Sequence, residues 1–272
     1  MDKLFAQLGV ENSYSVQQYR EGKFVEVLDR LAEEVPIAMV YNGVSHAVML
    51  ATPQDLEDFA LGFSITEGIL QDKSELYDVE VKTQDNGIEL HLEVSAQRFS
   101  QLKEHRRSMA GRTGCGLCGT ESLSHVFRLP VASVKDRLTQ PAIKIESILK
   151  ANHNMRDLQV LQQITGATHA CAWSDAEGNV GVLKEDVGRH NAMDKLIGAL
   201  LKQGKQGGFI LTTSRASYEM VQKVAMAGFD VLTAISAPTG LAVRIAEMHH
   251  VTLLGFVRDQ QFVAYSHVNR II

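Results

Sequence analysis

The sequence predicts an α/β protein whose N-terminal part is α+β, and two patterns indicate this fold class. In the C-terminal half, short apolar strands alternate with amphipathic helices, which is typical of a largely parallel sheet covered by helices on both faces. In the N-terminal half, two hairpin signals flank one helix. We place a domain boundary at Leu138-Thr139-Gln140-Pro141, which divides the chain into residues 1–138 and 139–272.

The composition is that of an ordinary globular protein. Of the 272 residues, 45% are hydrophobic and 22% are charged, and the net charge of -5 argues against a nucleic-acid partner. Cysteine occurs only as Cys115, Cys118 and Cys171, and this low, odd count fits a reducing compartment better than a disulfide scaffold. Residues 1–15 lack the pattern of a signal peptide, and no apolar run reaches about 18 residues. We therefore expect a cytoplasmic protein without a membrane partner.

The N-terminal region begins with polar, irregular residues 1–22, which predict a loosely held arm. Apolar runs at 34–41 and 44–51 then flank Asn42-Gly43. Asn-Gly between apolar runs is the strongest short-range signal of a β-hairpin, so we expect one here.

A helix and a second hairpin are expected next. Thr52 is a candidate cap for a helix that starts at Pro53, has acidic residues in its first turns and ends near Gly68. Runs at 76–83 and 88–94 are joined by Asp-Asn-Gly and predict the second hairpin.

The C-terminal half is expected to open with a long amphipathic helix over 143–164, followed by a hairpin of 168–174 and 179–185. Strands at 180–183, 209–213 and 231–235 then each run into a loop and a helix. Two further strands close the chain, at 251–257 and 262–265.

These strand-to-helix junctions indicate a site for an anionic ligand. In an open parallel sheet such junctions meet at one edge, and helix N-termini there favour phosphate. Simple helix capping explains any single junction equally well, but three in succession favour a ligand. The cationic and hydroxyl side chains at the junctions are Arg189, His190, Ser214, Arg215, Ser217, Ser236 and Thr239.

Cys115 and Cys118 form a Cys-x-x-Cys pair in a glycine-rich segment that follows a basic stretch at 103–113. Nearby positive charge favours the reactive thiolate, which makes a packed structural pair the least favoured interpretation. A zinc site needs four ligands, and no second such pair exists. A redox motif fits the spacing but not the surrounding elements. Sulfur carriage, with a thiolate that accepts a sulfur atom as a persulfide, is the remaining interpretation, and the spacing alone does not choose among them.

A zinc deaminase is a superficial alternative. It carries His-x-Glu followed by Pro-Cys-x-x-Cys, and His91 and Glu93 precede the cysteine pair here. Gly114 stands where that proline is expected, and His91 alternates with apolar residues of a predicted strand, so we interpret it as a solvated strand residue. Cys171 lies between alanines in a predicted strand and is expected to be a packed core thiol.

Several segments together resemble the formate dehydrogenase accessory sulfurtransferase family. The resemblance extends from about residue 34 to the end of the chain and includes several long motifs in the same order. The segments are Gly111–Gly119, Asp186–Lys195, Ser236–Val243, Thr52–Phe63 and Thr66–Ile69.

This resemblance implies a sulfurtransferase that accepts sulfur from a cysteine desulfurase on Cys115, with Cys118 as its partner thiol. The sulfur then passes to the molybdenum (or tungsten) bis(molybdopterin guanine dinucleotide) cofactor that formate dehydrogenase requires. It also implies a homodimer and a C-terminal cytidine-deaminase-like three-layer α/β domain without deaminase chemistry. The cofactor-binding residues that it implies are Phe256, Val257, Arg258, Asp259, Gln260 and Gln261.

Two departures from the family pattern affect this cofactor-binding expectation. Ser214 replaces a usual glycine, and no second basic residue follows Arg258. No resident metal is expected. The alternatives to sulfur transfer are a cofactor carrier or chaperone in which the thiols are incidental, and a zinc-dependent deaminase-like hydrolase that uses His91 and the two cysteines.

Overall fold

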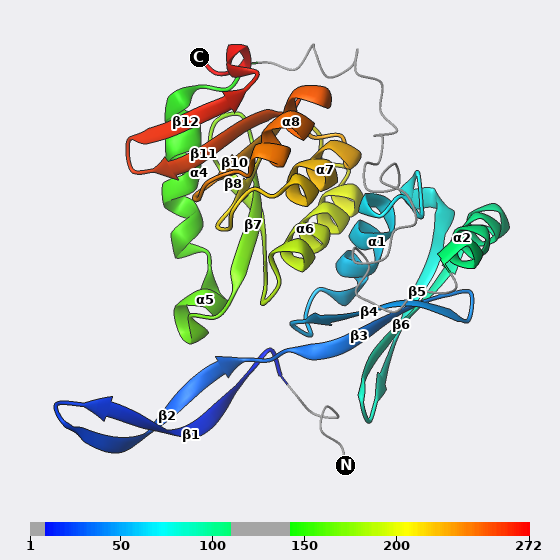
Figure 1. Ribbon diagram of the computed structural model, residues 1–272, viewed down its shortest axis with the longest axis horizontal. Helices are drawn as coiled ribbons and strands as arrows, with labels where there is room; N and C mark the ends of the chain where they lie inside the picture. Colours follow the sequence, from blue (N-terminus) through cyan, green and yellow to red (C-terminus); the bar gives the residue numbers. More distant parts are fainter. Residues whose placement is uncertain (1–8, 110–141) are drawn as a thin grey trace.

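A computed structural model describes residues 9–109 and 142–272 of the chain (Figure 1). Cys115, Cys118 and the predicted domain boundary at 138–141 lie outside these residues, so the boundary stays a prediction. The α/β class is confirmed, because two separate sheets are covered by helices. Within the described ranges, no helix combines the length and the apolar character that crossing a membrane requires.

The N-terminal unit is a four-stranded sheet in the order β4-β3-β6-β5. Both predicted hairpins are confirmed, and the central strands β3 and β6 run parallel. Asn42 and Gly43 have φ angles of 43° and 80°, the left-handed conformation that a tight two-residue hairpin turn requires. The elements are β3 (Val35–Tyr41), β4 (Val44–Ala51), α1 (Leu56–Thr66), η1 (Lys73–Glu75), β5 (Leu76–Gln84), β6 (Gly87–Val94) and α2 (Ala96–Met109).

Thr52 does not cap a helix that begins at Pro53, so that prediction is wrong. Helix α1 begins at Leu56, after Asp55 in a left-handed conformation (φ 54°). The Thr52 backbone N–H instead donates to Asp186 Oδ2 at 3.0 Å, which ties this loop to the C-terminal unit. Local sequence predicted Thr52 to be a helix cap, but in the structure this residue forms a long-range hydrogen bond to Asp186 instead.

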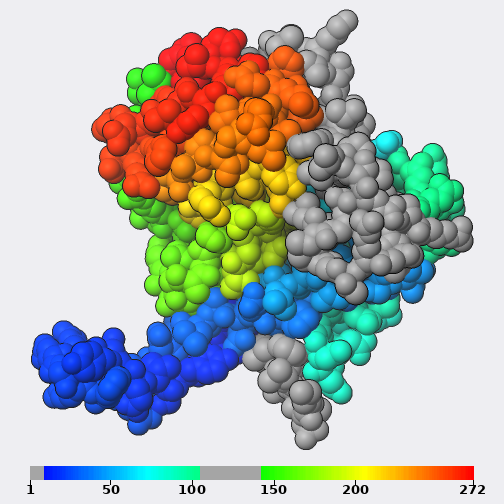
Figure 2. All heavy atoms as spheres, in the orientation of Figure 1, coloured from blue at the N-terminus to red at the C-terminus, as the bar shows by residue number. Residues whose placement is uncertain are grey.

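The prediction of a loosely held arm over residues 1–22 is wrong for its described part, residues 9–22. Strands β1 (Glu11–Arg20) and β2 (Lys23–Ala32) pair antiparallel around Glu21-Gly22. Both turn residues have positive φ, of 52° and 84°, so this is again a tight hairpin turn. The ribbon projects from the body of the molecule (Figure 2), and large apolar side chains on it such as Phe24 and Leu28 are exposed.

The C-terminal unit is a six-stranded sheet in the order β12-β11-β10-β9-β7-β8. Only the neighbouring pairs β9–β10 and β10–β11 are parallel, because β7 and β12 run antiparallel to their neighbours. The expected largely parallel sheet is therefore a mixed one. Its strands are β7 (His169–Ser174), β8 (Val180–Asp186), β9 (Phe209–Thr212), β10 (Val231–Ala234), β11 (Thr252–Arg258) and β12 (Gln261–Ser266).

Helices cover both faces of this sheet, which makes three layers (Figure 1). Ile210 of β9 packs with α6, α7 and α8 on one face, whereas Phe209 and Leu211 pack with α4 on the other. This alternation follows from the two-residue period of a strand. The cytidine-deaminase-like relationship stays a prediction. The helices are α4 (Ile145–Asp157), α5 (Val160–Thr165), α6 (Arg189–Gln203), α7 (Tyr218–Met226), α8 (Gly240–Met248) and η3 (Val268–Arg270).

The helix predicted over 143–164 is interrupted, which corrects that prediction. Helix α4 ends at Asp157, and the short helix α5 begins at Val160. The backbone N–H groups of Leu161 and Gln162 donate to the buried Glu185 carboxylate at 2.9 and 2.7 Å. A carboxylate from β8 thus binds a new helix N-terminus, where negative charge is stabilising.

Two glycines allow the two units to pack closely. A Cβ atom on Gly62 of α1 would lie 1.8 Å from the Asp194 carbonyl oxygen of α6, and one on Gly198 of α6 would lie 1.9 Å from the Asp58 carbonyl oxygen of α1. Any side chain at either position would overlap the backbone of the facing helix. We call this contact the α1–α6 junction.

Candidate ligand-binding edge of the six-stranded sheet

The candidate site is the edge of the six-stranded sheet at which β8, β9, β10 and β11 end. Strand β8 points in the same direction as β9, since each is antiparallel to β7 between them. The loops that follow these strands contact one another through the backbone: Thr239 N donates to Ala216 O at 3.0 Å, and Phe256 N donates to Ser236 O at 3.3 Å. We call these loops, with the first turns of α6 and α7, the carboxyl edge. The predicted gathering of the junctions at one edge is confirmed.

The predicted cofactor-binding residues Phe256–Gln261 lie at the same edge. Phe256, Val257 and Arg258 end β11, Asp259 and Gln260 form the turn, and Gln261 begins β12. Phe256 has a left-handed backbone (φ 53°) and is 39% exposed, whereas Val257 is buried. Arg258 Nε donates to the Ile235 carbonyl at 3.3 Å. The segment therefore adjoins the β10–α8 loop, and its role in binding stays a prediction.

The loop between β8 and α6 is held by a buried ion pair. Asp186 is fully buried, and its Oδ1 accepts from Gly188 N at 2.7 Å and from Asn191 Nδ2 at 3.0 Å. Lys195 Nζ lies 2.6 Å from Asp186 Oδ2 and donates to Thr52 O at 2.8 Å. These residues of the Asp186–Lys195 motif are thus structural.

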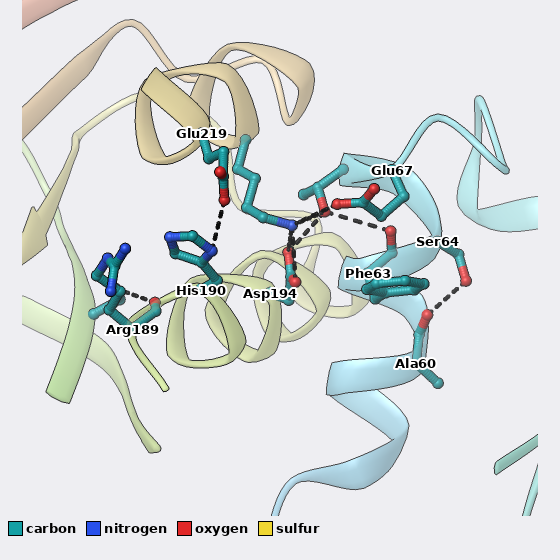
Figure 3. A network of polar contacts seen from close by, with 11 residues as sticks. Ala60, Phe63, Ser64, Glu67, Arg189, His190, Asp194 and Glu219 are labelled. Atoms are coloured by element: carbon teal, nitrogen blue, oxygen red, sulfur yellow. Dashed lines mark hydrogen bonds and ion pairs between the residues drawn. The ribbon is translucent and has the colours of Figure 1, made fainter. Parts of the chain in front are cut away.

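Arg189 and His190 lie in the first turn of α6 and have a different environment. His190 Nδ1 lies 2.7 Å from Glu219 Oε2 of α7 (Figure 3). The buried atoms Arg189 Nε, His190 Nε2 and Ser217 Oγ, which we call the edge atoms, have no hydrogen-bond partner within the described ranges. Leaving a buried polar atom without a partner costs about 1–3 kcal/mol, so such atoms need an explanation.

The other side chains predicted at the junctions have structural roles or are exposed to solvent. Ser214 is buried, and its Oγ lies 3.0 Å from Thr212 Oγ1, so the residue that replaces a family glycine is held inside the loop. Thr239 caps α8 by accepting from Ala242 N at 3.2 Å. Arg215 is exposed at the edge. The structure thereby separates Ser217 from the capping hydroxyls.

The electrostatics of the edge follow from burial and from these contacts. Burial alone would raise the pKa of Glu219, but its hydrogen bond to His190 and the positive charges around it hold that pKa below its usual value. Burial and the nearby Arg189 guanidinium lower the pKa of His169, which begins β7. A guanidinium, an imidazole and helix N-termini together suit an anionic ligand.

Sequence reasoning missed a buried ionic network behind the edge (Figure 3). Lys223 Nζ of α7 donates to both carboxylate oxygens of Asp194, at 2.8 and 2.9 Å, to Thr66 Oγ1 at 2.9 Å and to Glu67 Oε1 at 3.1 Å. These contacts join α7, α6 and α1. Glu219 was missed as well, because only tertiary packing brings it to His190, and no local pattern indicates this.

Cys171 is a packed core thiol, as predicted. It is fully buried in β7, with Sγ 3.5 Å from Thr212 Oγ1, and burial raises its pKa to about 12. The thiol is therefore inert at neutral pH, in contrast to the reactivity expected of Cys115 and Cys118.

His91 is half-buried on β6 and lies 2.8 Å from Glu89 Oε2, which agrees with a strand residue at the surface. Among residues 9–109 and 142–272, no three or more His, Cys, Asp or Glu side chains gather into a cluster that could hold a metal ion.

Comparisons with known proteins agree with the fold and extend over most of the chain. The model of the FdhD/NarQ family matches residues 32–272. The chain is 53% identical over 262 residues to the "Sulfur carrier protein FdhD" of Cupriavidus necator, covering 96% of this chain and 90% of that protein. It is also 53% identical over 245 residues to the protein of the same name from Bordetella petrii, covering 89% and 87%.

A solved structure shows the same fold. It is described as a putative formate dehydrogenase accessory protein from Desulfotalea psychrophila and superposes with a TM-score of 0.73 at 22% identity. The superposition covers 97% of this chain and 100% of that one.

Proposed function

The chain belongs to the FdhD/NarQ family, and from this premise we propose that it is a cytoplasmic sulfurtransferase required for formate dehydrogenase activity. Its first partner is a cysteine desulfurase, which delivers a sulfur atom to Cys115 as a persulfide, with Cys118 as the partner thiol. The sulfur then passes to the molybdenum (or tungsten) bis(molybdopterin guanine dinucleotide) cofactor, which is a substrate here. The protein works as a homodimer.

The carboxyl edge is the observation that supports this cofactor. The cofactor carries two pyrophosphates, and the edge combines helix N-termini with Arg189, His190 and the exposed Arg215. Arg189 Nε and Ser217 Oγ can donate to phosphate oxygens, and His190 Nε2 can do so when the imidazole is protonated. A phosphate there would satisfy buried atoms that the described chain leaves unpaired.

The segment Phe256–Gln261 supplies a second kind of contact to the same ligand. The exposed ring of Phe256 offers a face on which guanine can stack, and base–aromatic stacking contributes about 1–3 kcal/mol per base. Arg258 lies beside the β10–α8 loop and adds a cation near it. Together these residues form a surface with contacts for both the phosphates and a base.

The test is the replacement of the proposed carrier thiol. Cells that lack their own copy of the protein are given the Cys115→Ala variant, and formate dehydrogenase activity is measured. We expect activity no higher than in cells without the protein, although the variant folds normally. Cys171→Ala is the matched control, because this buried thiol has no proposed role in transfer and its loss affects only packing. Normal activity with Cys115→Ala would overturn the proposal.

A cofactor carrier in which the thiols are incidental is the second candidate, and the unpaired state of the edge atoms in the described chain favours it equally. The double variant Cys115→Ala, Cys118→Ala separates the two. It fails to support formate dehydrogenase activity if the protein transfers sulfur, and it supports activity if the protein only carries the cofactor.

A further inference from the structure

His190 and Glu219 form a carboxylate–imidazole dyad at the carboxyl edge. Glu219 lies in the first turn of α7 and His190 in the first turn of α6, with Nδ1 and Oε2 2.7 Å apart (Figure 3). An ionised carboxylate only accepts hydrogen bonds, so it fixes the imidazole with Nδ1 protonated. In the neutral ring, Nε2 then carries a lone pair.

That lone pair faces no donor in the part of the chain that the structure describes, although Nε2 is buried. A neutral Nε2 opposes an anion, because both are hydrogen-bond acceptors. A protonated Nε2 becomes a donor that carries positive charge, and charge-assisted hydrogen bonds to phosphate are stronger than neutral ones. An anion at this edge therefore binds better to the imidazolium form.

We propose that the His190–Glu219 dyad couples the binding of a phosphate-bearing ligand at the carboxyl edge to the uptake of a proton at His190 Nε2. The inference rests on the proposed function only in taking the ligand to bear phosphate. Glu219 is a positioning residue: its carboxylate orients the ring and stabilises the imidazolium. Arg189 Nε and Ser217 Oγ are two further buried donors of the carboxyl edge.

The charges around the dyad leave Glu219 available for this role. Lys223 of α7 faces Glu219, but Asp194 of α6 and Glu67 of α1 pair with it, at 2.8 and 3.1 Å. On the other side, Asp186 at the end of β8 pairs with Lys195 at 2.6 Å. Both lysines are thus already paired with carboxylates.

Two further groups lie near the dyad in the described ranges: Arg189 beside His190 on α6, and His169 at the start of β7. Arg189 is a second positive charge at this place, and the Glu219 carboxylate interacts with both Arg189 and His190. Burial lowers the pKa of His169, which keeps its ring neutral and makes it a control rather than a second proton acceptor.

The test is calorimetric titration of inorganic pyrophosphate into the full-length protein at fixed pH, in buffers with different ionisation enthalpies. The dependence of the observed heat on the buffer reports the number of protons taken up. We expect uptake of a fraction of a proton that does not exceed about one, and an affinity that falls as the pH rises.

Variants assign the proton to one atom. His190→Gln retains an amide donor but cannot titrate, so it should bind pyrophosphate with no proton uptake. His169→Gln is the matched control and should retain the uptake of the wild type. Glu219→Gln removes the stabilising charge and should shift the uptake to lower pH.

The wild-type protein alone can contradict the inference. Pyrophosphate binding without proton uptake would overturn it, as would unchanged uptake in His190→Gln or an absence of saturable binding. Persulfide formation on Cys115 is measured on the same preparations. If the persulfide forms but binding is not proton-linked, the dyad proposal fails and the proposed function stands. If binding is proton-linked but no persulfide forms, the proposed function fails and the dyad proposal stands.

Discussion

Polar atoms of helix α6 are buried at both the α1–α6 junction and the carboxyl edge, but they have partners at the junction and lack them at the edge within the described ranges. At the junction Asp194 pairs with Lys223, and the next residue of α6, Lys195, pairs with Asp186 at the end of β8. At the edge, Arg189 and His190 bury nitrogens that lack partners in the described ranges. The polar groups of the junction hold the two units together, whereas those of the edge are arranged for a ligand. Mutations at the junction should therefore lower the stability of the protein, whereas mutations at the edge should weaken ligand binding and change stability little.

The largest expected effect is at the ion pair of the junction. Asp194→Ala leaves the Lys223 ammonium buried without its main counterion, and breaking a buried pair in this way costs about 3–5 kcal/mol. Chemical denaturation of the purified variant measures the change in the free energy of unfolding. Lys202→Met, which removes a 40% exposed partner of Asp58, is the control and should cost less than about 1 kcal/mol. A loss no larger than in this control would show that the pair does not hold the junction.

The next largest loss of stability is expected when the close approach of α1 and α6 is blocked. Gly198→Ala places a methyl group 1.9 Å from the Asp58 carbonyl oxygen, which forces α1 and α6 apart and should cost about 2–3 kcal/mol of unfolding free energy. In Gly240→Ala the nearest atom to the new Cβ is Arg244 Nη1 at 3.8 Å, so the same substitution should be close to neutral in the same denaturation assay. Equal effects at the two glycines would contradict the packing described here.

A smaller, pH-dependent effect is expected from Cys171 of β7, which packs in the same core cluster as α6. Burial raises its pKa from 9.0 to about 12, so the unfolded chain releases this proton first as pH rises. The stabilising contribution is complete below about pH 9 and is lost toward pH 12, with a loss of about 1 kcal/mol between pH 9 and pH 10. Denaturation at these two pH values, compared with Cys171→Ala, isolates the effect. An identical pH dependence in the variant would exclude the thiol as its source.

The smallest effect on stability is expected at the edge. Ser217→Ala removes a buried hydroxyl that caps nothing in the described chain, so unfolding free energy should change by less than about 0.5 kcal/mol while pyrophosphate affinity falls several-fold. Thr239→Ala is the matched variant, because its hydroxyl does cap α8, and it should cost about 1 kcal/mol. A Ser217→Ala protein that is clearly destabilised but binds normally would place Ser217 among the structural residues.

Sequence reasoning succeeded where the determinants are local. Asn42-Gly43 encodes its hairpin in two residues, and that hairpin is confirmed. The β1–β2 ribbon was missed although Glu21-Gly22 makes the same kind of turn, because β1 is mostly polar and both strands are largely exposed, without a clear buried apolar face. The break between α4 and α5 depends on Glu185, which is more than twenty residues away in sequence.

The same distinction applies to the site. The alternation of strands and helices predicted that the junction residues would meet at one edge, and they do. It could not predict that Ser214 turns inward or that Glu219 reaches His190, because both depend on side-chain packing between separate elements. The sequence identified the polar residues at these junctions, but only the structure showed which of them are structural and which are candidates for ligand binding.

The central claim is that this protein carries sulfur on Cys115. Its most direct test is mass spectrometry of the cysteine-containing peptides after incubation with a cysteine desulfurase and cysteine, with the buried Cys171 as an internal reference. We expect one added sulfur atom on Cys115, which is lost on reduction and absent without the desulfurase, and an unmodified Cys171. Free, alkylatable Cys115 and Cys118 without added sulfur would contradict it, and the carboxyl edge would then belong to a cofactor carrier.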